Sequence, residues 1–280
     1  MKALNHSGIC RICGKHTELT PEHIPPKNAF NSSNVTVLPF SETVKVLEGA
    51  NGRMPWDNQG LRGTIQQGGH KKYCLCRSCN NNTGQWYMRS YTDFVKTLHS
   101  MIVGSKLDVG SKYVFEIDEL YPLRLYKAMM TLICDINNDC FGDENLRAFL
   151  LEKETKEIDL SKYSLYIYLV SSQMPRIWGL SGIVNIFNSK ELIMVSEVAS
   201  YPLGFALYID KPNSYTPFGL NANVFATFDY YSKCRMRFQG MPYLDLNSHF
   251  PIDYRTKDEI ISCIDDQKED LDKNTGFSQS

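Results

Sequence analysis

Two C-x-x-C pairs, CRIC at Cys10 to Cys13 and CRSC at Cys76 to Cys79, constrain this chain more than any other feature. Thiolates at positions i and i+3 of a tight turn can face one tetrahedral ion, and two such turns fill all four positions of a structural zinc site. The first 70 or so residues are rich in Gly, Pro, Asn and Ser, with few periodic apolar runs, so they need a cross-link in place of a large core. The pairs therefore predict a structural zinc site.

Cys74 lies two residues before Cys76 and is a rival zinc ligand. The spacing to Cys79 favours Cys76, because C-x-x-C is the usual zinc knuckle. The chain has nine cysteines, an odd number, which does not indicate a disulfide framework. With no run of about 18 apolar residues and no charged-then-apolar leader, we expect a cytoplasmic protein without a membrane span. The cysteines without knuckle spacing are expected to be buried small hydrophobic residues: Cys134, Cys140, Cys234 and Cys263.

The two parts of the chain differ in charge. The formal net charge of the whole chain is -1, which alone indicates no partner. Residues 1–100 contain twelve Lys and Arg residues against six Asp and Glu residues, a net charge of +6, so the remainder carries about -7. Four thiolates on one zinc ion would lower the first figure by about two units and leave this part mildly basic.

The expected fold class is α+β, with a domain boundary near residue 105. Residues 1–104 are predicted to form the zinc domain, 105–260 an accessory α+β domain, and 261–280 an acidic, partly disordered tail. Apolar residues at helical spacing predict a helix from Asn82 onward and a second helix over 122–136. Five β-branched and aromatic segments, separated by turn residues, predict a mostly antiparallel sheet. These segments are 164–170, 176–187, 191–199, 203–209 and 223–231.

The loop between the cysteine pairs contains TPEHIPP, in which Glu22 and His23 are adjacent. Four thiolates already close the zinc site, so the acid and the histidine need a different explanation. Neighbouring side chains on an extended segment point to opposite sides. Glu22 could therefore hold a second metal ion while His23 addresses a water molecule near it, and Pro25 and Pro26 stiffen the exit of the segment. An ordinary exposed Glu-His pair is the alternative.

The stretch CRICGKHTELTPEHIPP followed by CLCRSCNNNTG resembles the HNH endonuclease family, specifically its zinc-stabilised four-cysteine members. In that family an Asp/Glu-His-Ile-x-Pro motif precedes C-x-x-C-Asn/His in a ββα-metal, treble-clef-like fold clamped by zinc. The resemblance covers about residues 8–100, roughly a third of the chain. It implies a metal-dependent endonuclease that hydrolyses phosphodiester bonds, in DNA rather than RNA.

The resemblance also implies roles for individual residues. His23 would be the general base that activates water, and Glu22 and Asn80, directly after Cys79, would be ligands of a catalytic Mg²⁺ or Mn²⁺ ion. Carboxylate and amide oxygens suit such a hard ion. An imidazole with its unperturbed pKa near 6.5 is mostly free base at neutral pH, as a base must be.

Two features depart from the family pattern. The family's middle Asn, which orients the catalytic His, falls here at Lys71 or Lys72, with His70 one position earlier as the candidate for that role. The interval between His23 and the second cysteine pair is long for a ββα hairpin. We therefore expect an insertion over residues 35–69 that contacts substrate.

Basic residues around the motif are the candidate phosphate contacts, and the accessory part is expected to serve recognition, regulation or assembly, as a homo-oligomer or with a partner protein. Added domains are common among small HNH proteins of anti-phage defence systems and mobile elements, so that context is implied as an association. A non-catalytic zinc-knuckle module that binds nucleic acid and an interaction adaptor are the alternatives. The candidate phosphate contacts are Lys71, Lys72, Arg77 and Arg89.

Overall fold

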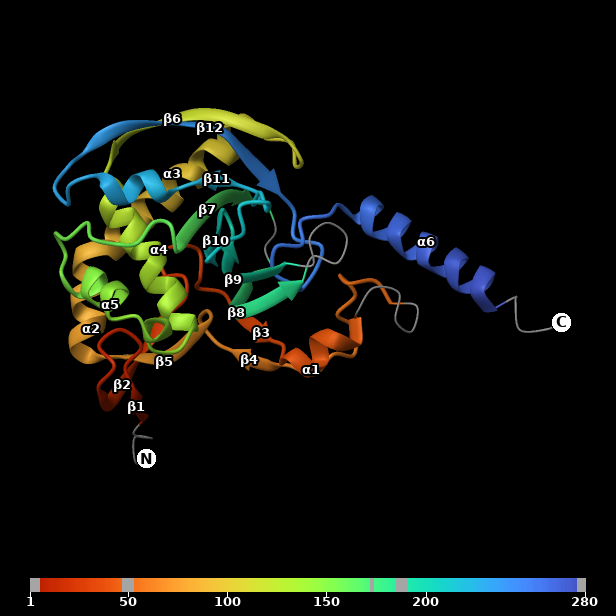
Figure 1. Ribbon diagram of the computed structural model, residues 1–280, viewed down its shortest axis with the longest axis horizontal. Helices are drawn as coiled ribbons and strands as arrows, with labels where there is room; N and C mark the ends of the chain where they lie inside the picture. The colour runs from red at the N-terminus through yellow and green to blue at the C-terminus, as the bar shows by residue number, and fades with distance from the viewer. Residues whose placement is uncertain (1–5, 47–52, 172–173, 185–190, 276–280) are drawn as a thin grey trace.

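The structure is a computed structural model that describes residues 6–46, 53–171, 174–184 and 191–275. Within these residues the strands form three sheets, of three, seven and two strands, and helices pack between and beside them (Figure 1). The chain is therefore a mixed α+β protein, as its sequence predicts.

The three-stranded sheet brings the two cysteine pairs together. Its order is β1 (Ser7–Ile9), β2 (His16–His23) and β5 (Lys71–Cys76), and both pairings are antiparallel. The first cysteine pair occupies the turn between β1 and β2, and the second begins at the last residue of β5. Pairing of β2 with β5 thus brings together residues that are 48 to 57 positions apart in the chain.

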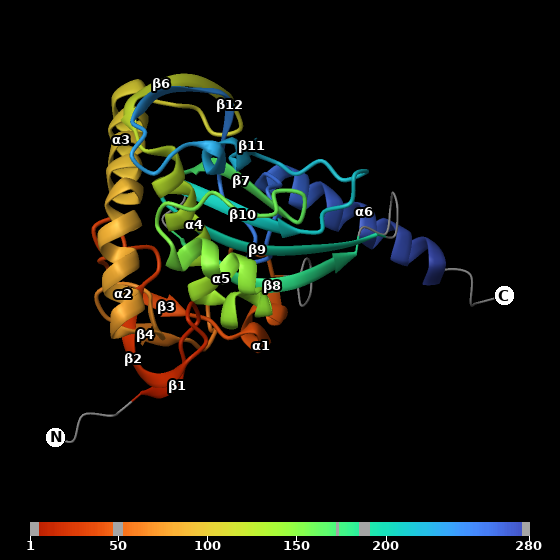
Figure 2. The same cartoon turned by 60° about the vertical axis from the view of Figure 1, so that its left-hand side comes forward.

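A helix follows β5 immediately. It comprises α2 (Arg77–Thr83) and α3 (Arg89–Ser105), joined by a π-helical turn. The expected start at Asn82 is wrong, because the Cys79 backbone N–H donates a hydrogen bond to the Cys76 sulfur at 3.4 Å and so caps an earlier first turn. Figure 2 shows α2 and α3 as one column along the side of the molecule, with β1 and β2 near one end and β6 at the other.

The segment between β2 and β5 forms the expected insertion. In its described part, β3 (Val35–Val37) pairs antiparallel with β4 (Thr64–Gln66) in the two-stranded sheet. Between these strands lie α1 (Phe40–Thr43) and the 3-10 turn η1 (Val44–Val46). The insertion lies against the end of the large sheet that carries β8 (Figure 1).

Helix α4 (Pro122–Ile136) is the centre of the core and has the predicted bounds. Every residue in it except Arg124 is buried, because it contacts β5, α3 and α5 as well as strands of the large sheet. One buried cluster runs across the predicted boundary at residue 105; for example, the rings of Tyr91 and Phe205 meet edge to face. The two predicted domains therefore share a core.

The large sheet has the strand order β6-β12-β7-β10-β9-β8, with β11 added beside β7. All neighbours are antiparallel except β12 and β7, so the predicted mostly antiparallel sheet is confirmed. The strands are β6 (Lys112–Leu120), β7 (Tyr163–Val170), β8 (Arg176–Val184), β9 (Leu192–Ser200), β10 (Leu203–Ile209), β11 (Leu220–Asn221) and β12 (Cys234–Leu244).

The strand predicted over 223–231 is wrong, because a 3-10 turn, η5 (Asn223–Thr227), stands at its beginning. The Asn223 amide accepts a hydrogen bond from Leu165 N at 2.9 Å and donates one to Tyr163 O at 2.9 Å, so its side chain replaces strand pairing. Three strands of the large sheet, β6, β12 and the two-residue β11, were not predicted. Charged residues are interspersed with apolar ones in β6 and β12, as in a strand that has one solvated face, so neither contains a continuous apolar run.

The remaining elements are the 3-10 turn η4 (Asp139–Gly142), α5 (Glu144–Leu151) and α6 (Lys257–Thr275). Helix α6 projects from the body of the molecule (Figure 1). The tail predicted to be partly disordered is thus helical as far as residue 275. Residues 276–280 lie outside the described residues. No helix in the described part of the chain is both long enough and apolar enough to cross a membrane.

Candidate active site

Four cysteines form a compact thiol cluster. The sulfur atoms of Cys10, Cys13, Cys76 and Cys79 all lie within 4.8 Å of one another, and this cluster could bind a metal ion such as zinc. The Cys76 backbone N–H donates to the Cys10 sulfur at 3.3 Å. The hydrogen bond with Cys79 lowers the pKa of the Cys10 thiol to about 4, so the cluster carries a thiolate at neutral pH.

Cys74 is not part of this cluster. It is fully buried, its thiol donates to the carbonyl of Lys72 at 3.6 Å, and burial raises its pKa far above the usual range. The sulfur atom that completes the cluster belongs to Cys76, which agrees with the preference that the C-x-x-C spacing gave.

Asn80, on the first turn of α2, reaches back to β2. Its amide donates to the Thr20 hydroxyl at 3.0 Å and to the Pro21 carbonyl at 3.5 Å, which places it close enough to Glu22 to affect the pKa of that carboxyl group. Burial raises the pKa of Glu22 to about 7, and the bond from Asn80 opposes this shift. The carboxylate and the amide predicted as ligands of a divalent cation are thus neighbours, although 58 positions separate them in the chain.

His23 is the last residue of β2, and its Nε2 lies 3.2 Å from the carbonyl oxygen of Gly68. A carbonyl only accepts hydrogen bonds, so Nε2 carries the proton and Nδ1 keeps a free lone pair. Gly68 is held in turn, because its N–H donates to the Asn34 side chain at 3.2 Å. Its φ of +72° is in the left-handed region that favours glycine. The turn before β5 therefore fixes the ring of His23 in the tautomer that a base needs.

His70 lies close enough to His23 for the two charges to interact. Its Nδ1 is 3.3 Å from the carbonyl oxygen of Ile24, and burial lowers its pKa. The His70 backbone N–H donates to the Asn31 amide oxygen at 2.8 Å, and the Asn31 amide donates to the carbonyls of His70 at 2.9 Å and Pro25 at 2.6 Å. Asn31 thus ties the strand end that carries His23 to the turn that orients it.

Asn31 was not among the sequence-based candidates, and the family register placed the orienting residue near His70 instead. A buried asparagine eight residues after the histidine gives no spacing signal, because its partners are backbone groups of two distant turns. The one clue is the pair Gly68-Gly69: a Cβ at Gly69 would collide with the Asn31 carbonyl, so this close approach requires glycine.

Replacing Asn31 with alanine should destabilise the protein by about 2 kcal/mol, because it leaves buried backbone groups without partners. The free energy of unfolding in urea measures this effect. Asn28→Ala, at an exposed asparagine of the same loop, is the matched control and should change the stability by less than about 0.5 kcal/mol. Equal effects in the two variants would contradict the role given to Asn31.

Asp135 is a second residue that the sequence analysis missed. It is fully buried in α4, and neither of its carboxylate oxygens has a hydrogen-bond partner among the described residues. Burial raises its pKa well above the usual range, and the nearby charge of Glu22 adds to the shift. An acid inside the apolar run LICDI was the available signal. The accessory part thus contributes a neutral carboxyl group behind Glu22.

The predicted phosphate contacts occupy different surroundings. Lys71 and Arg77 are exposed at the two ends of β5, and Lys71 pairs with His23 in the strand register. Lys72 is turned toward α4, where its Nζ donates to the Ile136 carbonyl at 3.3 Å and burial lowers its pKa. Arg89 lies further along the helix, 3.7 Å from Asp93. Of the four, Lys71 is exposed at the end of β5 that carries His23, and Arg77 is exposed at the other end, next to Cys76.

The structure therefore brings Asn80 to Glu22 and His70 to His23, at neighbouring positions of β2, while Cys76 lies at the other end of the β2–β5 pairing. Comparisons with protein-family models, with curated proteins and with solved structures find no match to this chain.

Proposed function

We propose that this chain is a metal-dependent endonuclease of the HNH type that hydrolyses phosphodiester bonds in DNA. The observation that carries the proposal is that the Asn80 amide lies close enough to Glu22 to lower its pKa, while Nδ1 of the next residue, His23, has no hydrogen-bond partner among the described residues. A carboxylate, an amide oxygen and an oriented imidazole are the groups that metal-assisted hydrolysis of a phosphodiester uses.

Each residue has a distinct task in this proposal. His23 accepts the proton of the attacking water at Nδ1, while the Gly68 carbonyl holds Nε2–H. Glu22 and the Asn80 amide oxygen would hold Mg²⁺ or Mn²⁺, which when bound supplies charge neutralisation at the phosphate and the leaving oxygen. To bring its oxygen to the cation, the Asn80 amide would turn and give up the hydrogen bond that its nitrogen donates to the Thr20 hydroxyl. Lys71 and Arg77 then meet the flanking phosphates.

The thiol cluster has a structural role in this proposal and takes zinc. It fixes the turn before β2 and the start of α2, and thereby sets the position of Asn80 relative to Glu22. All four positions of a tetrahedral site are filled by sulfur, so no position is left for substrate.

A cleavage panel tests the function. Supercoiled plasmid, linear duplex, branched DNA, single-stranded DNA and RNA are each incubated with Mg²⁺, Mn²⁺ or EDTA. Cleavage of at least one DNA substrate that EDTA abolishes supports the proposal. Binding to DNA without cleavage under all conditions would instead favour a non-catalytic zinc-knuckle module.

Removing either proposed oxygen ligand should weaken divalent-cation binding. Glu22→Gln and Asn80→Ala should each lower the affinity for Mn²⁺ by at least about tenfold, measured by calorimetry on zinc-loaded protein. Asn81→Ala is the matched control, because Asn81 is the exposed neighbour of Asn80 on the same helix. An unchanged affinity in both Glu22→Gln and Asn80→Ala would place the cation elsewhere.

The affinity for the divalent cation should also depend on pH. Because burial raises the pKa of Glu22 to about 7, its carboxyl group is mostly protonated at pH 6 and mostly ionised at pH 8. Protons and Mn²⁺ compete for the same oxygens, so the affinity should be about tenfold higher at pH 8 than at pH 6. Equal affinities at the two pH values would contradict a raised pKa at this carboxylate.

A further inference from the structure

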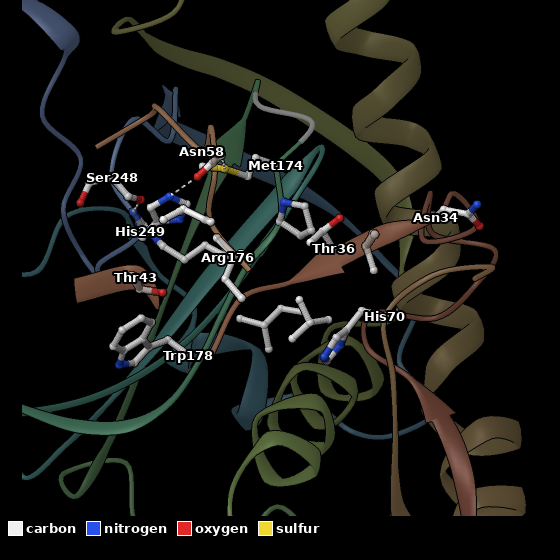
Figure 3. Close-up of a pocket in the computed structure, with 16 residues that line it drawn as sticks. Asn34, Thr36, Thr43, Asn58, His70, Met174, Arg176, Trp178, Ser248 and His249 are labelled. Atoms are coloured by element: carbon white, nitrogen blue, oxygen red, sulfur yellow. Dashed lines mark hydrogen bonds between the residues drawn. The ribbon is translucent and has the colours of Figure 1, made fainter. Parts of the chain in front are cut away.

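A cavity of about 580 Å³ lies beside the candidate active site. The insertion forms one wall, through β3 and residues such as Asn58, and the accessory part forms the other, through β8 and His249. Figure 3 shows His70 at one end of the cavity and Trp178 at the other. The two walls are joined by a hydrogen bond of 2.8 Å between the His249 ring and the Asn58 side chain.

The described residues that line this cavity offer no free charge. None of them is Asp or Glu, and the guanidinium of Arg176 is neutralised by the buried Glu197 carboxylate at 2.6 Å and also donates to two backbone carbonyls. Burial lowers the pKa of both lining histidines, His70 and His249, which keeps them neutral at neutral pH. A phosphate or another anion therefore finds no cation here, and an ammonium group finds no carboxylate.

The lining instead offers an aromatic face and spare hydrogen-bonding capacity. Trp178 is half-buried, with the ring of Phe40 at 5.9 Å in a T-shaped arrangement and the ring of Phe250 tilted against it at 5.8 Å. Within the described residues, the Asn34 amide nitrogen has no hydrogen-bond partner, and the Asn58 amide nitrogen has only a 3.8 Å contact with a methionine sulfur. The Nε2 atom of His70 is likewise not engaged by a described residue. A neutral, flat ligand with donors and acceptors on its edge fits these features.

The cavity is also continuous with the catalytic end of β2. His70 lines the cavity, and its carbonyl accepts a hydrogen bond from Ile24 N at 3.1 Å, one residue after His23. A base in the cavity and a phosphate at His23 can therefore belong to neighbouring positions of one nucleic-acid strand. The size suits a single nucleotide and excludes a duplex, whose bases are stacked and paired.

We propose that this cavity binds one unpaired nucleobase of the substrate strand, next to the phosphate that is cleaved. This inference rests on the proposed nuclease function and names its substrate class: DNA in which a base is already unpaired or is turned out of the helix. Stacking on Trp178 and bonds to Asn34, Asn58 and His70 compensate for the cost of unstacking that base.

Tryptophan fluorescence tests the proposal without relying on cleavage. The chain has three tryptophans, Trp56, Trp86 and Trp178. In the His23→Ala protein with Mg²⁺, a 12-nucleotide single-stranded DNA should quench the fluorescence, because a base stacks on the Trp178 indole. Trp178→Phe should remove this quenching, whereas Trp86→Phe, at a tryptophan outside the cavity lining, should keep it. Equal quenching in the two variants would overturn the proposal.

Affinity provides the second measurement. Trp178→Ala should raise the Kd for the 12-nucleotide strand by about tenfold, and one abasic position in the strand should raise it similarly for the protein with Trp178 but not for Trp178→Ala. A Kd that no abasic position alters would overturn the cavity proposal. The two proposals can fail separately. Trp178-dependent quenching without any cleavage by the unsubstituted protein would support the nucleobase site and contradict the nuclease function. Cleavage without that quenching would contradict only the nucleobase site.

Discussion

Replacing His23 with alanine should abolish Mg²⁺-dependent DNA cleavage, with a fall in rate of at least about 100-fold, and should leave the fold and the metal content unchanged. The reason is that Nδ1 of His23 has no hydrogen-bond partner among the described residues, while the bond through Nε2 fixes the ring. Its loss removes the proton acceptor but no ligand of either cation. The measurement is the single-turnover cleavage rate on the best substrate of the panel.

His16→Ala is the matched control for this substitution. His16 lies at the opposite end of the same strand and is exposed, so its removal should not alter the rate. Thermal unfolding and zinc content of both variants should equal those of the unsubstituted protein. A His23→Ala protein that still cleaves at the original rate would rule out this histidine as the base.

Cys79→Ser should remove bound zinc and unfold the N-terminal part of the molecule. The thiol cluster joins the turn after β1 to the start of α2, and binding of zinc to four thiolates contributes about 10 kcal/mol or more to folding. The total stability of a domain is of similar size, so loss of one thiolate is expected to be severe. Zinc per chain, measured by atomic absorption, should fall from one toward none, together with solubility and helical circular dichroism.

Cys74→Ala separates the two cysteines that compete in the sequence. Cys74 is buried next to the cluster but hydrogen-bonds to the Lys72 carbonyl, so its removal should cost about 1 kcal/mol of stability and leave one zinc ion per chain. Loss of zinc in Cys74→Ala together with its retention in Cys76→Ser would show that the ion is held by Cys74 in place of Cys76.

The sequence predicts those parts of the molecule in which local pattern and tertiary structure agree. Helix α4 has its predicted bounds because a proline opens it and almost all its residues are apolar and buried. The cysteine spacing predicts the thiol cluster, since four sulfur ligands within two tight turns leave little choice of geometry. The contact of Glu22 with Asn80 was expected only through the family resemblance, since the long interval between them hides it.

Features that depend on distant backbone partners could not be predicted. Asn31 bonds to two turns that come together only in the folded chain, and Asp135 becomes notable only because it is buried beside Glu22 without a partner. The early start of α2 depends on a sulfur atom as a cap, which propensity does not include. The strand expected over 223–231 failed because Asn223 bonds to the backbone of β7.

Helices α2 and α3, which start at the thiol cluster, connect the two halves of the chain through one shared core. Tyr91 and Phe94 on α3 pack against Phe205 and Phe238 of the large sheet, and Arg11, inside the first cysteine pair, hydrogen-bonds to Asn138 beyond α4 at 2.6 Å. A gene fragment that encodes only the first 104 residues would expose these aromatic rings to water. Recombination is therefore expected to transfer the two halves of this protein together, because neither half has a complete hydrophobic core of its own.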